Sequence, residues 1–87
     1  MSQQHFTYIV RCADTTYYCG YTTDLERRVG QHNRGEASKY TRSRLPVELV
    51  YFEEYITKSE ALAREVALKK LSRKKKAQLE GLGRADR

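Results

Sequence analysis

Two runs of β-branched and aromatic residues stand near the start of the chain, separated by a short polar gap. The runs are residues 5–12, His-Phe-Thr-Tyr-Ile-Val-Arg-Cys, and residues 17–22, Tyr-Tyr-Cys-Gly-Tyr-Thr. Side chains of these types favour strands. The gap between the runs, Ala-Asp-Thr-Thr, leaves room only for a turn. We therefore expect an antiparallel hairpin.

The chain then changes to patterns that are typical of helices. Thr23 with Glu26, and Thr57 with Glu60, have the spacing of a capping box. In a capping box the hydroxyl and the carboxylate accept from two backbone N–H groups at the start of a helix. The first predicted helix runs to about residue 33, with Gly35 beyond it as a stop, and the second runs to about residue 71.

The remaining elements complete a small mixed fold. Residues 47–56, Val-Glu-Leu-Val-Tyr-Phe-Glu-Glu-Tyr-Ile, predict a third strand, and Ser72 can cap a last short helix to about residue 79. Residues 34–46 show neither pattern and are expected as a loop. The predicted fold is α+β: a three-stranded antiparallel sheet flanked by helices, in the order β-β-α-β-α-α. We expect one domain over residues 1–80 and a flexible tail over residues 81–87.

The charge balance indicates an anionic partner. The 17 Lys and Arg residues outnumber the 11 Asp and Glu residues and give a net charge of +6. Such an excess attracts polyanions, nucleic acid above all. No apolar run is long enough to span a membrane, and no secretory signal is visible. We expect a cytoplasmic protein, a monomer or a weak dimer, without a membrane partner.

Glu65 occupies an unusual position on the second predicted helix. Its neighbours one turn away are three apolar residues and one lysine: Ala61, Leu62, Leu68 and Lys69. A carboxylate in such surroundings is costly unless it is paired, hydrogen-bonded or bound to a metal ion. The spacing by itself favours the plain alternative, a surface ion pair with Lys69 worth roughly a few tenths of a kcal/mol.

Basic residues gather in two segments. Six lysines and arginines fall within residues 69–76, Lys74 and Lys75 among them. The predicted loop around Tyr40 adds three more: Lys39, Arg42 and Arg44. A solvated helix surface is the plain interpretation of the first segment. Because cations neutralise phosphates and a tyrosine ring can stack on a base, both segments are expected to contact nucleic acid.

Several of these residues, taken in order, resemble the GIY-YIG nucleases. The ordered set is Tyr8, then Tyr18-Cys19-Gly20, then Arg28, then Glu65 on a late helix. This spacing is similar to that in the nuclease domain of the bacterial endonuclease of nucleotide-excision DNA repair. The segments 25–28, 39–42 and 60–65 are similar to those of small stand-alone bacterial members. The first triplet, Phe6-Thr7-Tyr8, lacks the glycine and isoleucine of the family's name, and Cys19 replaces an isoleucine.

The resemblance implies roles for particular side chains. The catalytic set would be Tyr8, Tyr18, Arg28, His32 and Glu65. In the family the arginine contacts the scissile phosphate, the glutamate holds a divalent metal ion, and the position of His32 lies near the nucleophilic water. Tyr21 stands where several relatives have a lysine, and we expect it to contact the substrate.

The chemistry of the metal and of the base follows in part from general principles. Mg²⁺, or Mn²⁺ in its place, needs as few as one or two carboxylates, so Glu65 alone suffices as protein ligand. His32 has the intrinsic pKa nearer neutrality, whereas family precedent favours Tyr8, so the base is left open between them. Tyr8 and Tyr18 share a sheet face only if the hairpin loop has an odd number of residues or a bulge intervenes.

The predicted function is therefore a metal-dependent endonuclease that hydrolyses phosphodiester bonds of DNA, with single-stranded and branched DNA as candidate substrates. The first alternative is a non-catalytic nucleic-acid-binding module on the same fold. The second is a protein–protein adaptor with an incidental positive surface. The enzyme hypothesis requires that Glu65, Arg28 and Tyr8 converge in space.

Overall fold

Three antiparallel strands form the sheet at the centre of the fold. The computed structural model describes residues 3–82. In it, β1 (His5–Arg11) lies between β2 (Tyr17–Thr22) and β3 (Glu48–Tyr55). The middle of β1, from Thr7 to Val10, is buried on both faces of the sheet, which explains its nearly unbroken apolar and β-branched sequence. β2 is left as an edge strand.

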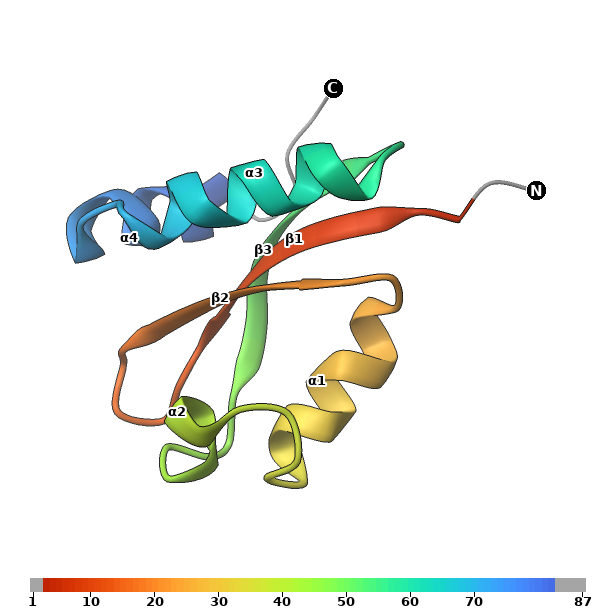
Figure 1. Cartoon of the computed structure of the whole chain (residues 1–87). Helices are drawn as coiled ribbons and strands as arrows, with labels where there is room; N and C mark the ends of the chain where they lie inside the picture. Colours follow the sequence, from red (N-terminus) through yellow and green to blue (C-terminus); the bar gives the residue numbers. More distant parts are fainter. Residues whose placement is uncertain (1–2, 83–87) are drawn as a thin grey trace.

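Within the described residues, helices cover both faces of the sheet (Figure 1). One layer holds α1 (Leu25–Asn33) and α2 (Lys39–Arg42), and the other holds α3 (Lys58–Lys69) and α4 (Arg73–Leu82). Each layer has its own apolar cluster. Tyr8 and Val10 pack with Leu25 and Val29 of α1, whereas Ile9 and Cys19 pack with Leu68 of α3 and Leu79 of α4. The predicted α+β class with a three-stranded antiparallel sheet is confirmed.

Three local predictions need correction. The N-cap of α1 is Asp24 and not Thr23, because the Asp24 side chain accepts from the N–H of Arg27 at 3.1 Å. The expected loop over residues 34–46 contains α2, whose first turn is capped by the Ser38 side chain. α4 continues to Leu82, two residues into the expected tail, and the rest of that tail lies outside the described residues. None of the helices within residues 3–82 has the length and hydropathy needed to cross a lipid bilayer.

The capping box at the start of α3 is confirmed. The Thr57 side chain accepts from the N–H of Glu60, and the Glu60 carboxylate accepts from the N–H of Thr57. At the start of α4 the Ser72 hydroxyl accepts from the N–H of Lys75 at 3.2 Å, as expected of a cap.

A buried carboxylate fixes α3 on the sheet. Glu53 of β3 accepts hydrogen bonds from the hydroxyls of Tyr51 and Tyr55, both at 2.5 Å, and from Arg64 of α3 at 2.8 Å. Burial by itself would raise the pKa of Glu53, but these three donors hold it below its usual value. Nearby, the Thr7 hydroxyl donates to the carbonyl oxygen of Ala61 at 2.6 Å. These contacts set the position of α3 along the sheet.

The hairpin register places Tyr8 and Tyr18 on the same face. Tyr8 lies opposite Gly20, and Val10 lies opposite Tyr18. Directly opposed residues of an antiparallel pair share a face, and residues two apart in one strand do so too. The loop spans residues 12–16, an odd number, so the condition set by the sequence is met without a bulge between these two strands.

Gly20 allows the Tyr8 ring to cross the edge strand. A Cβ atom added at Gly20 would lie 2.5 Å from the Tyr8 hydroxyl oxygen and 2.6 Å from Cζ. The Tyr8 side chain is only 1% exposed and has little room to move aside. The glycine therefore serves the close approach of a ring to the backbone.

We predict that Gly20→Ala will lower the free energy of unfolding by about 1–3 kcal/mol, because the added methyl group overpacks the buried Tyr8 ring. Denaturant unfolding followed by circular dichroism measures the change. Gly81→Ala is the matched control: a Cβ there meets nothing within 4 Å, so alanine should be neutral or slightly stabilising in the helix. Equal stability of the Gly20→Ala variant and the unmodified chain would contradict the proposed approach.

Candidate active site

A buried hydrogen-bond chain runs from the sheet into the α1 and α2 layer. The Tyr8 hydroxyl oxygen lies 2.8 Å from Nε2 of His32 in α1, and Nδ1 of His32 lies 2.9 Å from Oγ1 of Thr41 in α2. All three side chains are at most 1% exposed. α2, which the sequence pattern did not predict, thus supplies the last member of the chain.

We assign the tautomer of His32 from the Thr41 hydroxyl. With that hydroxyl donating to the carbonyl oxygen of Ser38, 3.3 Å away, its oxygen is free to accept from Nδ1–H of His32. Neutral imidazole carries one N–H, which makes Nε2 the acceptor and the Tyr8 hydroxyl its donor. Burial, together with the nearby Arg28 guanidinium, lowers the pKa of His32 and favours this neutral form.

Charged side chains from both helical layers act on the Tyr8 phenol. Burial raises the pKa of Tyr8 to about 12, the Arg28 guanidinium acts to lower it, and Tyr18 and Glu65 add to the rise. Arg28 belongs to α1 and Glu65 to α3. The sequence hypothesis required Tyr8, Arg28 and Glu65 to meet, and the structure places Arg28 and Glu65 each within electrostatic reach of the Tyr8 phenol.

Arg28 is held at the outer edge of the sheet. Its Nε donates to Oε1 of Gln31 at 2.9 Å, and one terminal nitrogen donates to the carbonyl oxygen of Tyr21 at 3.2 Å. The Tyr21 side chain points elsewhere: its hydroxyl pairs with Nδ1 of His5 at 2.7 Å, and the ammonium of Lys58 lies 5.8 Å from its ring centre. Tyr21 therefore contributes its backbone, not its ring, to the surroundings of Arg28.

Glu65 is mostly buried and faces two kinds of neighbour. Its side chain is 18% exposed, and Oε2 lies 3.2 Å from Nζ of Lys69, so the ion pair that the spacing favours is present. The same carboxylate also acts to raise the pKa of Tyr8 and of Cys19, so its charge influences buried side chains as well as the surface. The ion pair between Glu65 and Lys69 is therefore compatible with a role of Glu65 in the site.

The donor set fits a cation that needs few protein ligands. Among residues 3–82, no three His, Cys, Asp or Glu side chains are grouped to hold a metal ion. A closed zinc site with four protein ligands is therefore not built here. Mg²⁺ keeps several waters and accepts one or two carboxylates together with substrate oxygens, and Glu65 meets that requirement.

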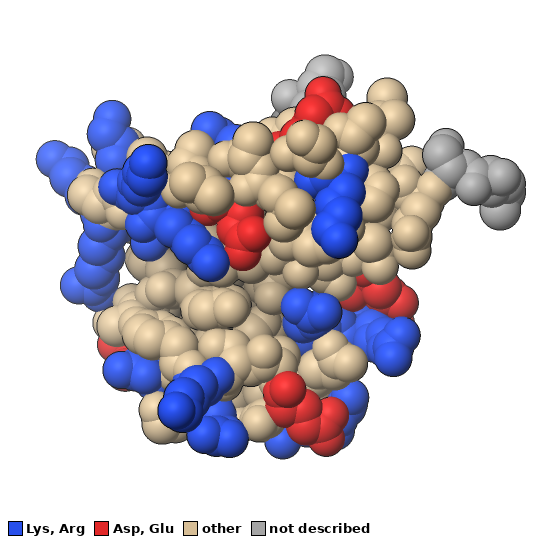
Figure 2. Space-filling model, in the orientation of Figure 1, with Lys and Arg blue, Asp and Glu red and all other residues tan. Residues whose placement is uncertain are grey.

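Tyr18 joins this cluster to a groove on the surface. Its ring meets the His32 ring edge-on with centroids 5.3 Å apart, and it lies nearly parallel to the Tyr40 ring at 6.0 Å. Beside these rings is a pocket of about 250 Å³, which is lined by Tyr17, Tyr18, Cys19, Tyr40, Lys69 and Lys76. Figure 2 shows this face of the molecule hollowed between the two helical layers, with basic side chains on either side.

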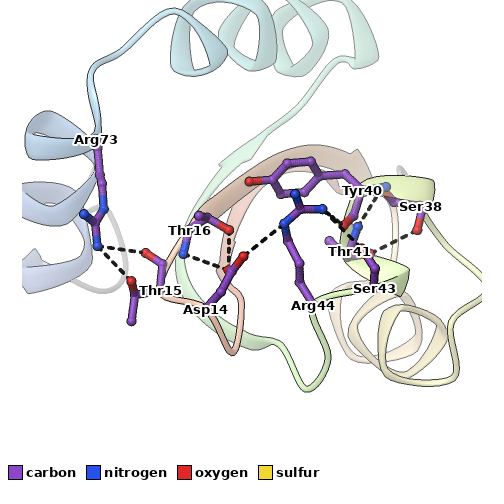
Figure 3. A network of polar contacts seen from close by, with 9 residues as sticks. All are labelled: Asp14, Thr15, Thr16, Ser38, Tyr40, Thr41, Ser43, Arg44 and Arg73. Atoms are coloured by element: carbon purple, nitrogen blue, oxygen red, sulfur yellow. Dashed lines mark hydrogen bonds and ion pairs between the residues drawn. The ribbon is translucent and has the colours of Figure 1, made fainter.

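The predicted nucleic-acid contacts are distributed unequally around the groove. Tyr40 lines it, and the Arg44 guanidinium lies 3.9 Å from the centre of the Tyr40 ring. Arg44 is itself held by the Asp14 carboxylate at 3.1 Å and by the Tyr40 carbonyl oxygen at 2.7 Å (Figure 3). A second pocket of about 200 Å³ adjoins the first and is lined by Thr16, Tyr17, Tyr40, Arg73 and Lys76. The other four predicted contacts are exposed and line neither pocket: Lys39, Arg42, Lys74 and Lys75.

Within the basic segment 69–76 the sequence singled out Lys74 and Lys75, but the residues of that segment that line the groove are Lys69, Arg73 and Lys76. Arg73 and Lys76 are three residues apart in α4, so they share a side of the helix, while Lys74 and Lys75 point away from it. That spacing was visible in the sequence. Which side of α4 faces the hairpin was not.

Thr41→Val should remove the acceptor of the His32 Nδ1–H and preserve the shape of the side chain. We predict a loss of about 1–3 kcal/mol in the free energy of unfolding, because a buried donor is left unsatisfied. We also predict altered ¹⁵N shifts of the His32 ring, because its tautomer is no longer fixed. Thr41→Ser keeps the hydroxyl and is the control. Unchanged imidazole shifts in the valine variant would refute the assigned tautomer.

Acidification should weaken the fold through His32. The unfolded ring titrates near 6.5, whereas burial and Arg28 lower the pKa of the folded ring. Between about pH 7 and pH 5 the unfolded chain therefore binds protons first, and the free energy of unfolding should fall. NMR titration of the His32 ring should give a midpoint below 6.5. A midpoint at or above 6.5 would count against a buried neutral ring.

Comparisons with known proteins identify the family of this chain. The family description GIY-YIG catalytic domain matches residues 4–78. A UPF0213 protein of Haloquadratum walsbyi is 56% identical over 79 residues, which cover 91% of this chain and 89% of that protein. A UPF0213 protein of Listeria innocua is 51% identical over 75 residues, which cover 86% of this chain and 83% of that protein.

Solved structures support the same assignment. The solution NMR structure of a UPF0213 protein from Bacillus halodurans is similar with a TM-score of 0.57 at 46% identity, covering 91% of this chain and 84% of that one. An NMR structure of a protein from E. faecalis has a TM-score of 0.59 at 44% identity, covering 88% and 82%. The resemblance found in the ordered residues is confirmed, and the chain belongs to the GIY-YIG family.

Proposed function

We propose that this chain is an endonuclease that hydrolyses phosphodiester bonds of DNA with the help of a divalent metal ion. Membership of the GIY-YIG family places it in a nuclease superfamily, whose substrates are nucleic acids. The observation that supports the finer proposal most directly is the environment of the Tyr8 hydroxyl. It is hydrogen-bonded to a neutral His32, and besides burial, which raises its pKa, Arg28 acts to lower that pKa and Glu65 to raise it.

Arg28 supplies the fixed positive charge of the site. An arginine stays protonated at every working pH and can grip two phosphate oxygens through its fork. Gln31 and the Tyr21 carbonyl hold the guanidinium in place before any substrate arrives. Such preorganised charge stabilises the extra negative charge that develops on the phosphate during attack.

Tyr8 and His32 together serve as the base. A phenol with a pKa of about 12 is almost fully protonated at neutral pH, so Tyr8 is a poor base by itself. The hydrogen bond to Nε2 of His32 offers a path for the proton of the Tyr8 hydroxyl. As the Tyr8 oxygen takes a proton from the attacking water, its own proton passes to His32, which becomes the imidazolium. The sequence left the base open between Tyr8 and His32, and we propose that the two work as a pair.

Glu65 would hold the metal ion, for which we propose Mg²⁺, with Mn²⁺ as a substitute. Such an ion supplies charge neutralisation at the phosphate. Binding it competes with the Lys69 ion pair, which otherwise balances the Glu65 carboxylate. A cytoplasmic location and a monomer or weak dimer remain parts of the proposal.

Glu65→Gln should reduce cleavage of fluorescently labelled DNA to background in Mg²⁺ and in Mn²⁺, because the amide replaces the carboxylate that holds the ion. Glu36→Gln, at an exposed glutamate paired with Arg34, is the control and should cut normally. Paramagnetic broadening by Mn²⁺ near residue 65 gives a readout besides activity. A Glu65→Gln variant that is folded and cuts at the unmodified rate would end the metal assignment. Binding of DNA without cleavage in either metal would favour the non-catalytic alternative.

A further inference from the structure

Three tyrosine rings surround one small pocket next to the candidate active site. Tyr17 and Tyr18 come from β2, and Tyr40 comes from α2. At about 250 Å³ the pocket is smaller than the roughly 300–1,000 Å³ typical of sites for drug-sized ligands. Its size and its aromatic lining suit a single flat ring and not a larger ligand.

The rings are held in place by polar contacts. The Tyr17 hydroxyl donates to Glu80 of α4 at 2.7 Å. Tyr40 is braced by the Arg44 guanidinium, which is fixed in turn by Asp14 of the hairpin loop (Figure 3). Rings that are already ordered lose little conformational entropy when a ligand stacks on them.

Cations line the pocket and extend beyond it. Lys69 and Lys76 form part of its wall. A second pocket, of about 200 Å³, shares Tyr17, Tyr40 and Lys76 with the first and adds Arg73. Because they share these residues, the two pockets form one continuous groove that is lined by tyrosine rings and by cations. Arg73 also bonds to Oγ1 of Thr15 at 2.9 Å, so the groove passes beside the hairpin loop (Figure 3).

The groove is connected to the candidate active site at two points. Tyr18 contacts the His32 ring, and Lys69 pairs with Glu65. The lysine side is also electrostatically connected to β2: burial raises the pKa of the Cys19 thiol, while Lys76 and Lys69 act to lower it. A ligand in the groove would therefore contact residues that themselves touch His32 and Glu65.

We propose that this groove takes an unpaired nucleotide next to the scissile phosphate, with its base among the tyrosine rings and its flanking phosphate on Lys69 or Lys76. The inference rests on the proposed function and narrows its substrate to single-stranded or locally unpaired nucleic acid. A base inside a duplex is stacked and paired on both sides, so it cannot enter a pocket without leaving the helix. Aromatic rings beside cations are the usual means of binding unpaired strands.

Binding in the absence of metal tests the inference apart from cleavage. Fluorescence anisotropy in EDTA would compare a single-stranded DNA oligonucleotide, the same sequence as a duplex, and an abasic oligonucleotide of equal length and charge. We expect the single strand to bind more tightly than both of the others. Equal affinity for the single strand and the abasic strand, or tighter binding of the duplex, would overturn the proposal.

Substitutions of Tyr40 then test whether the nucleobase stacks on its ring. Tyr40→Leu should weaken binding of the single strand about 5- to 150-fold, the range for loss of one base–aromatic stack, and leave abasic binding unchanged. Tyr40→Phe keeps the ring and should bind normally. Tyr40 is 37% exposed, so these changes are expected to leave the fold intact. An equal loss for both oligonucleotides would refute stacking on Tyr40.

Separate alanine substitutions of Lys76 and Lys70 test the proposed phosphate contact in the groove. Lys76→Ala should weaken both oligonucleotides and reduce the slope of log affinity against log salt by about 0.7, the value for one phosphate contact on a single strand. Lys70→Ala, at an exposed lysine outside both pockets, should change neither. Identical behaviour of the two lysine variants would refute the groove. Base-dependent binding without cleavage would instead refute the proposed function and leave the groove in place.

Discussion

The passage of the Tyr8 ring over Gly20 is the contact on which the rest of the site depends. It carries a hydroxyl from the central strand across the edge strand, where His32 accepts its hydrogen bond. Any side chain at position 20 would collide with the ring. Because the ring is buried, its position is set by the core and not by the surface. The proposed chemistry thus depends on the absence of one Cβ atom.

The two helical layers contribute opposite charges to this phenol. α1 brings the Arg28 guanidinium, and α3 brings the Glu65 carboxylate. α3 is located by the buried Glu53, which binds Arg64, the residue directly before Glu65. A buried carboxylate with three donors is a rigid anchor, because moving any partner away leaves an uncompensated charge. The sheet edge therefore becomes a place where a phosphate could meet cations, a carboxylate and a hydrogen-bonded phenol together.

The groove shares two residues with the candidate active site. Tyr18 belongs both to the surroundings of His32 and to the aromatic wall, and Lys69 belongs both to the ion pair of Glu65 and to the cationic wall. Through these shared residues, a molecule bound in the groove would contact side chains that touch His32 and Glu65. Under the proposed function, this connection would allow the domain itself to take part in substrate selection.

Sequence patterns alone determined the strands, the α+β class, the family, and the ordered residues Tyr8, Arg28 and Glu65. These follow from local preferences and from chemical types at fixed spacings, which are written directly in the chain. Only the tertiary structure decided the contact of Thr41 with His32, the Tyr8–His32 hydrogen bond, and the side of α4 that faces the groove. Those features depend on contacts between distant segments, and such contacts exist only after packing has set which faces meet.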